Sequence, residues 1–137
     1  MSRHHGAFPA TMDAFPRVDA LIAQVCAEAA FGREDCLRLT LVVEELFTNT
    51  VTHGLRDGGT IELVLDALPG RIAVIYEDTG PEFDPFAVRE PPEAAAGVED
   101  RPVGGLGLVL VGRLGRNVEY SHADGRNRIS LVMHTAR

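Results

Sequence analysis

Two pairs of apolar segments, each joined by a tight-turn signal, constrain the fold more than any other feature of this sequence. Pro-Gly in the middle of the first linker is typical of a type II turn, and Asp-Gly in the second is typical of a hairpin. The predicted strands and linkers are Thr60–Leu68 and Arg71–Asp78 around Pro69-Gly70, and Asn117–His122 and Asn127–His134 around Ala123–Arg126. Strands joined as hairpins run antiparallel, so we expect a mainly antiparallel mixed sheet.

Apolar residues at helical spacing predict three helices, over about Phe15–Ala30, about Arg33–His53 and Gly104–Leu114. We expect Asp13 to cap the first helix and Gly32 to end it. The third helix is apolar nearly all round, which predicts that it is well buried.

Residues 1–12 suit a short edge strand or an extended arm. Hairpin strands with segregated helices predict an α+β two-layer sandwich, with about three helices on one face of the sheet, rather than a doubly wound α/β fold. A length of 137 residues predicts a single domain over 1–137.

The charged residues exclude several classes of function. All 13 basic residues are Arg, and without a Lys the chain can form neither a Walker A phosphate loop nor a Schiff base. A net charge of -7 argues against direct nucleic-acid binding. Cys26 and Cys36 suit neither a disulfide framework nor a metal site, and no apolar stretch is long enough for a signal peptide or a membrane span. We therefore expect a cytoplasmic protein with no membrane partner.

The second predicted helix carries a polar stripe. Glu45, Asn49 and His53 are four residues apart, with Thr48 and Thr52 beside them. The stripe is either a solvated face or a binding site. An Asn oxygen suits Mg²⁺, and a nearby Glu can orient or deprotonate a nucleophile.

Two residues of this helix leave alternatives open. Glu44 competes with Glu45 for the role of base, but it is rotated by about 100° around the helix, so we favour Glu45, which shares the face of Asn49. His53 either binds a ligand or interacts with the dipole at the helix end.

Two further segments could bind a ligand. Asp78 ends a strand and is followed by Gly80, so it could accept a hydrogen bond from an exocyclic amine while the chain passes close to a ring; an ordinary turn is the alternative. The run Gly104-Gly105-Leu106-Gly107 opens a helix, where free backbone N–H groups bind anions, or it is simply a linker. A dinucleotide fingerprint does not fit, because these glycines follow the Pro-rich loop Thr79–Val103 instead of a strand.

Together these segments resemble the nucleotide site of the gyrase, heat-shock chaperone, histidine kinase and mismatch-repair (GHKL) ATPase superfamily, over roughly residues 15–134. The chain looks most like the free-standing anti-sigma-factor serine/threonine kinases of bacterial partner-switching systems. Two stretches favour that branch: Glu44-Glu45-x-x-x-Asn49-x-x-x-His53-Gly54, and Asp-x-Gly-x-x-Phe-Asp-Pro at 78–85.

The resemblance implies ATP and Mg²⁺ as cofactors. It implies Asn49 as the Mg²⁺ ligand, Glu45 as the base, Asp78 and Gly80 around adenine, and the backbone of Gly104, Gly105, Leu106 and Gly107 at the phosphates. The loop over 79–103, chiefly 84–103, would be the ATP lid. Since the chain has no Lys, an Arg would add positive charge at the phosphates: Arg101 or, failing that, Arg89. The alternative, which we favour for each residue taken alone, is a solvated loop charge.

The sequence departs from the family pattern in three places. Glu82 replaces the second glycine after Asp78. Many relatives place a Thr near the last strand to support the adenine-binding Asp, whereas the residues there are Asn127, Arg128 and Ser130, any of which could take that role. The lid is also short and poor in basic residues.

The implied function is a kinase that acts as an anti-sigma factor: it phosphorylates an anti-sigma-factor antagonist and sequesters a sigma factor. The alternatives are a nucleotide-gated interaction module with little or no kinase activity, and a structural domain without a nucleotide site. The resemblance also implies homodimerisation through a sheet edge or the first strand, a role that residues 1–12 could serve.

Overall fold

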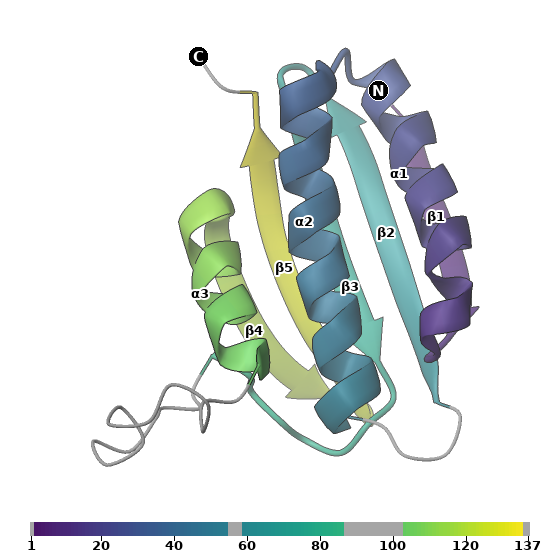
Figure 1. Cartoon of the computed structure of the whole chain (residues 1–137), viewed down its shortest axis with the longest axis vertical. Helices are drawn as coiled ribbons and strands as arrows, with labels where there is room; N and C mark the ends of the chain where they lie inside the picture. Colours follow the sequence, from purple (N-terminus) through teal and green to yellow (C-terminus); the bar gives the residue numbers. More distant parts are fainter. Residues whose placement is uncertain (1, 55–58, 87–102, 136–137) are drawn as a thin grey trace.

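The computed structural model describes residues 2–54, 59–86 and 103–135. Figure 1 shows three helices on one face of a twisted sheet, so the predicted two-layer α+β sandwich is confirmed. The helices are α1 (Phe15–Glu28), α2 (Arg33–Asn49) and α3 (Val103–Leu114), and the strands are β1 (Ser2–Pro9), β2 (Thr60–Leu68), β3 (Arg71–Asp78), β4 (Arg116–Ala123) and β5 (Arg126–His134). The sheet has the order β1-β2-β3-β5-β4, and every pairing between these strands is antiparallel.

The two hairpins form where the turn signals predict them. Gly70 has a φ of 71°, as the third position of a type II turn requires, and β2 and β3 have the predicted bounds. In the second hairpin Asp124 and Gly125 have φ values of 56° and 73°, the pattern of a two-residue type I′ turn. This turn is tighter than the predicted four-residue linker, so β4 and β5 extend one residue further toward it.

The ends of α1 differ from the prediction. Asp13 is not a cap: it lies in a 3₁₀ turn over Met12–Ala14, and α1 begins after Ala14 without a side-chain cap. Ala30, with a φ of 56°, reverses the chain after α1, and Phe31 N–H donates to the Cys26 carbonyl at 2.9 Å. This is a Schellman ending with Ala in the position that usually takes Gly, and Gly32 instead precedes α2 as its N-cap.

The second helix also ends differently. The predicted helix runs to His53, but the α-helical part stops at Asn49 and one π-helical turn follows over Thr50–Gly54. Such wider turns are rare and occur frequently at functional sites. Here the turn lies directly after the polar stripe of α2.

The prediction that α3 is well buried is wrong. Leu108 and Val111 are buried, but Val109 is 52% exposed and Leu110 is 37% exposed. Figure 1 shows the reason: α3 lies at the edge of the helical layer with α2 as its helical neighbour, so the sheet and α2 cover one side of it. None of the helices within the described ranges has the length and apolar character of a membrane span.

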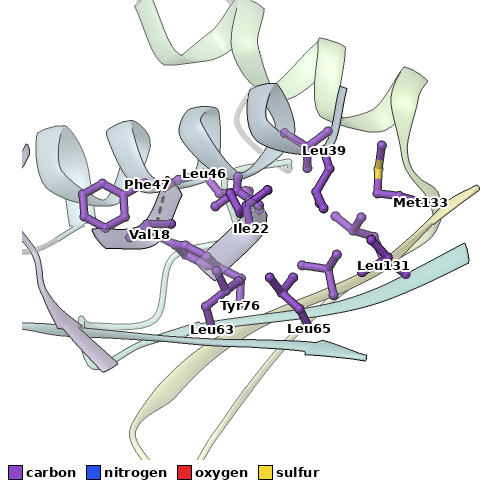
Figure 2. Packing of buried hydrophobic residues seen from close by; sticks show 14 of the residues in the cluster. Val18, Ile22, Leu39, Leu46, Phe47, Leu63, Leu65, Tyr76, Leu131 and Met133 are labelled. Atoms are coloured by element: carbon purple, nitrogen blue, oxygen red, sulfur yellow. Dashed lines mark hydrogen bonds between the residues drawn. The ribbon is translucent and has the colours of Figure 1, made fainter. Parts of the chain in front are cut away.

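The core lies between the helices and the sheet, as Figure 2 shows for the residues it labels. From α2, the side chains of Leu39, Leu46 and Phe47 belong to this core and are at most 2% exposed. The Phe47 ring meets the Phe15 ring edge-on, with centroids 5.5 Å apart and planes inclined by 72°. The core thereby fixes the rotation of α2, and with it the direction in which its polar stripe points.

The opposite face of the sheet carries a small charged network. Glu77, next to Asp78, accepts from Arg128 at 2.6 Å and from Arg126 at 3.3 Å, and Arg126 also reaches Glu62 at 3.1 Å. Exposed ion pairs of this kind contribute little stability. Because successive side chains along a strand point to opposite faces of the sheet, Asp78 and Asn127 point to the helical side.

Replacing Phe47 with Ala should lower the free energy of unfolding by about 3–5 kcal/mol, because the change opens a cavity in the centre of the core. The control is Leu37→Ala on the same helix, where the side chain is 60% exposed and the expected loss is within about 0.5 kcal/mol. Urea denaturation followed by circular dichroism measures both; equal losses would contradict this packing.

Candidate nucleotide site

Four segments far apart in the sequence meet at one end of the molecule. The C-terminal end of α2, the end of β3, the start of β5 and the start of α3 all lie at the lower end of Figure 1. The α2 and α3 helices pack against each other, and β3 and β5 are neighbouring strands. This arrangement brings the polar stripe, the strand-ending Asp and the glycine-led helix to one end of the fold.

Asp78 is the best-defined polar residue at this end. It is 8% exposed, and both of its carboxylate oxygens accept hydrogen bonds. Oδ1 accepts from the Gly80 backbone N–H and from Asn127 Nδ2, each at 3.0 Å, and Oδ2 accepts from the Thr50 hydroxyl at 3.2 Å. All three of these donors are neutral, so the described residues hold the carboxylate in place without pairing it with a cation.

A buried hydroxyl pair supports Asp78 from the core side. The Tyr76 hydroxyl lies 2.7 Å from Thr50 Oγ1, and each hydroxyl lies 3.1 Å from the Leu46 carbonyl. Burial raises the pKa of Tyr76, so its hydroxyl stays protonated and donates. The Tyr76 proton to Thr50 and the Thr50 proton to Asp78 form a chain that polarises toward the carboxylate.

Asn49 is the buried polar residue that lacks this kind of support. It is 7% exposed, and its side chain makes no hydrogen bond with any residue in the described ranges. An amide buried without a partner is costly. Its position next to Asp78 and Thr50, on the wall of a cavity, gives its oxygen and nitrogen a place to bind a ligand.

The cavity beside Asp78 is small, with about 20 Å³ of room for water, enough for roughly one molecule. Polar atoms of Asn49, Thr50, Asp78 and Asn127 meet apolar groups there. The wall consists of Leu46, Asn49, Thr50, Tyr76, Asp78, Phe83, Pro85, Asn127 and Ile129.

The two candidate bases lie on α2 before Asn49. Glu45 and Glu44 are both half-buried, and neither borders the cavity. Glu45 shares the helix face of Asn49 and stands one turn away, about 6 Å along the axis. Thr48 is half-buried and Thr52 is exposed. The polar stripe therefore passes from half-buried positions into the cavity wall at Asn49.

For the remaining predicted site residues, the structure gives only part of the arrangement. Gly104, Gly105, Leu106 and Gly107 lie within the first five residues of α3, which begins at Val103, one residue earlier than predicted. Gly80 is buried in the turn after β3. Arg89, Arg101 and the side chain of His53 lie outside the described residues, as does most of the predicted lid, 87–102.

Asn127 resolves one alternative that the sequence left open. It pairs with Asp78 in the β3–β5 ladder, whereas Arg128 pairs with Glu77 on the open face and Ser130 pairs with Ile75 further along. Asn127 is thus the residue of β5 that supports Asp78. Thr50, Tyr76 and Tyr120 were missed altogether, although Tyr76 stands two residues before Asp78 and therefore on the same face of its strand.

Known proteins match this chain over most of its length. The model for the histidine kinase-like ATPase domain matches residues 8–133, and the chain belongs to that family. It is 29% identical over 120 residues to the serine-protein kinase RsbW of Halalkalibacterium halodurans, covering 85% of this chain and 74% of that protein. It is 31% identical over 100 residues to the serine/threonine-protein kinase BtrW of Bordetella bronchiseptica, covering 72% and 70%.

A solved structure supports the same assignment at the level of the fold. The RsbU and RsbW domains of a Mycobacterium tuberculosis protein align with a TM-score of 0.66 and 18% identity, over all of this chain and 33% of that longer one. The family match confirms the predicted superfamily, and both curated relatives are named as protein kinases that act on serine or on serine and threonine.

Changing Tyr76 to Phe should lower the free energy of unfolding by about 1 kcal/mol, because Thr50 and the Leu46 carbonyl lose a buried partner. Chemical denaturation measures the loss, with the exposed Ser121→Ala as a control expected to change nothing measurable. An unchanged denaturation midpoint in Tyr76→Phe would contradict the hydroxyl chain.

Proposed function

We propose that this chain is an ATP- and Mg²⁺-dependent serine/threonine kinase that acts as an anti-sigma factor, phosphorylating an anti-sigma-factor antagonist protein and sequestering a sigma factor. The observation that carries the proposal is the buried Asp78 carboxylate, whose donors among the described residues are all neutral, on a cavity that it shares with the Asn49 amide, which has no partner in the same part of the chain. Kinase relatives over most of the chain support the activity and the partner class.

Asp78 is suited to select adenine. Its carboxylate only accepts hydrogen bonds, and the three neutral donors around it leave that capacity available at the cavity. The exocyclic amine of adenine is a donor and would pair with it, whereas the carbonyl of guanine would face it with a second acceptor. The buried Gly80, next to the carboxylate, carries no side chain that would hold a ring away from it.

The Asn49 side chain fits a metal ligand. It offers a neutral oxygen, it is buried, and it has no partner among the described residues. Mg²⁺ commonly takes only one or two ligands from a protein and the rest from phosphates and water. Accordingly, no group of three or more His, Cys, Asp or Glu residues gathers into a metal site in the described part of the chain. Bound there, Mg²⁺ would supply the positive charge that phosphoryl transfer needs.

Glu45 would serve as the base toward the acceptor hydroxyl of the substrate protein. Its half-buried side chain lies one helical turn before Asn49 and does not border the cavity beside Asp78. In this arrangement Asp78 would hold the adenine, Asn49 would hold the metal and the phosphates, and Glu45 would face the reacting end of the nucleotide. The backbone N–H groups at the start of α3 would hold the phosphates together with Arg101 or Arg89.

The wider setting follows from the same proposal. The kinase would work in the cytoplasm as the single domain 1–137, without contacting nucleic acid or membrane directly. A homodimer would form through a sheet edge; β1 is such an edge in this sheet.

Changing Asp78 to Asn should weaken MgADP binding by roughly 10- to 100-fold, because the acceptor for the adenine amine becomes a neutral amide. Isothermal titration calorimetry measures the affinity. The matched control is Asp66→Asn on β2, where the carboxylate pairs with Arg3 at 2.8 Å on the open face and affinity should stay unchanged. Wild-type affinity in Asp78→Asn would refute the adenine assignment.

Changing Glu45 to Gln should leave MgATP binding intact and slow phosphotransfer by about 10²- to 10⁴-fold, the usual contribution of a general base. Phosphoserine and phosphothreonine formed on the antagonist protein provide the readout, and Glu44→Gln is the matched control. Loss of activity in Glu44→Gln instead would reverse the assignment. If Glu45→Gln retains nucleotide-dependent control of its partners, the chain works as a nucleotide-gated module without needing the transfer.

A further inference from the structure

The segment Pro81–Pro85, here called the strap, closes the cavity beside Asp78. Phe83 and Pro85 form part of the cavity wall, and Pro85 is buried. The remaining space, about 20 Å³, is far smaller than an adenine ring. With the strap in this position, Asp78 is therefore covered on the side from which a base would approach.

Two side chains hold the strap down. The Phe83 backbone N–H donates to Asn127 Oδ1 at 3.0 Å and to the Tyr120 hydroxyl oxygen at 3.1 Å, and the Tyr120 hydroxyl in turn donates to Asn127 Oδ1. Asn127 Nδ2 donates to the Pro81 carbonyl at 2.8 Å and to the Gly80 carbonyl at 3.3 Å. The Phe83 amide thus has two acceptors from two different strands.

Asn127 serves the strap and Asp78 at the same time. Its nitrogen reaches Asp78 Oδ1 at 3.0 Å, while its oxygen is used by Phe83 and Tyr120. The hydrogen-bonding capacity of its amide is filled by the protein itself, which leaves none for a base. Asn127 is therefore built to position its neighbours.

Tyr120 is the part of this arrangement that does not touch Asp78. It comes from the edge strand β4, where its hydroxyl contacts the strap and Asn127. Burial and the nearby carboxylates of Glu82, Asp84 and Asp78 raise the pKa of Tyr120, so the hydroxyl keeps its proton at neutral pH and donates.

We propose that Asn127 and Tyr120 form a latch that holds the strap over the adenine pocket, and that release of the Phe83 amide from this latch sets the rate at which the nucleotide enters. This inference rests on the proposed function, because it presupposes that adenine binds at Asp78. For the nucleotide to enter, Phe83 and Pro85 must move away from the cavity. The hydrogen bond between Asn127 and Asp78 stays intact, so that the Asp78 carboxylate is held ready for the adenine. Asn127 and Tyr120 are thus positioning residues for nucleotide binding.

The latch changes the kinetics of binding in a defined way. If only the unlatched state admits a base, the apparent affinity equals the intrinsic affinity multiplied by the fraction of molecules that are unlatched. Tyr120→Phe removes one acceptor of the Phe83 amide and one donor to Asn127, and leaves the three donors of Asp78 unchanged. It should raise the association rate of the nucleotide roughly two- to tenfold, the equivalent of one hydrogen bond, with an unchanged dissociation rate.

Stopped-flow fluorescence with a ribose-labelled fluorescent MgADP measures both rates in wild type, in Tyr120→Phe and in the control Glu119→Gln, an exposed neighbour on β4. Amide hydrogen exchange of Phe83, followed by NMR in the nucleotide-free protein, provides a readout that needs no ligand. The latch predicts that Tyr120→Phe accelerates exchange of the Phe83 amide by the same factor as association, whereas Glu119→Gln changes neither.

Three results would overturn the latch. In the first, the Phe83 amide exchanges without protection in the wild type. In the second, exchange accelerates in Tyr120→Phe while the association rate stays the same. In the third, Tyr120→Phe changes the dissociation rate instead. Failure of the proposed function looks different, because the wild type would then bind no MgADP although the Phe83 amide remained protected.

Discussion

A buried carboxylate determines how this end of the molecule is built. Asp78 is 8% exposed, and an anion taken out of water must be compensated by its surroundings. The protein compensates it with neutral donors: a hydroxyl from the end of α2, an amide from β5 and the backbone of its own turn. An Arg or Lys in their place would also stabilise the charge, but would occupy the acceptor sites and leave nothing for a ligand. Because its partners are neutral, the buried carboxylate can still accept a hydrogen bond from a ligand.

The parts of the fold that sequence could predict are those that local chemistry decides. The bounds of β2 and β3 follow from alternation and from Pro69-Gly70, and the three helices follow from their apolar spacing. Burial of α3 could not be predicted, because it depends on how many neighbours surround the helix: the same apolar pattern is fully covered in the middle of a layer and half exposed at its edge. The end of α1 was misplaced because Ala30 adopts a left-handed conformation that glycine normally takes.

The residues of the candidate site also divide into those that a local sequence pattern indicates and those that it does not. Glu45, Asn49 and Asp78 carry patterns within short segments, so the sequence could single them out. Asn127 could be narrowed only to three residues, because the choice depends on the register between β3 and β5. Tyr120 and Thr50 had no local signal: one acts from an edge strand across β5, and the other lies in a π-helical turn that the periodic pattern of α2 does not reveal.

The type I′ turn at Asp124-Gly125 limits how the length of the β4–β5 connection can vary. That turn sets the offset between β4 and β5, which contribute Tyr120 and Asn127. Shortening or lengthening the connection by one residue would rotate one strand by half a pleat, sending its apolar side chains to the open face of the sheet. Viable length variation at this hairpin should therefore come in steps that preserve strand parity, whereas the Pro69-Gly70 connection, remote from the nucleotide end, constrains only the packing of the sheet.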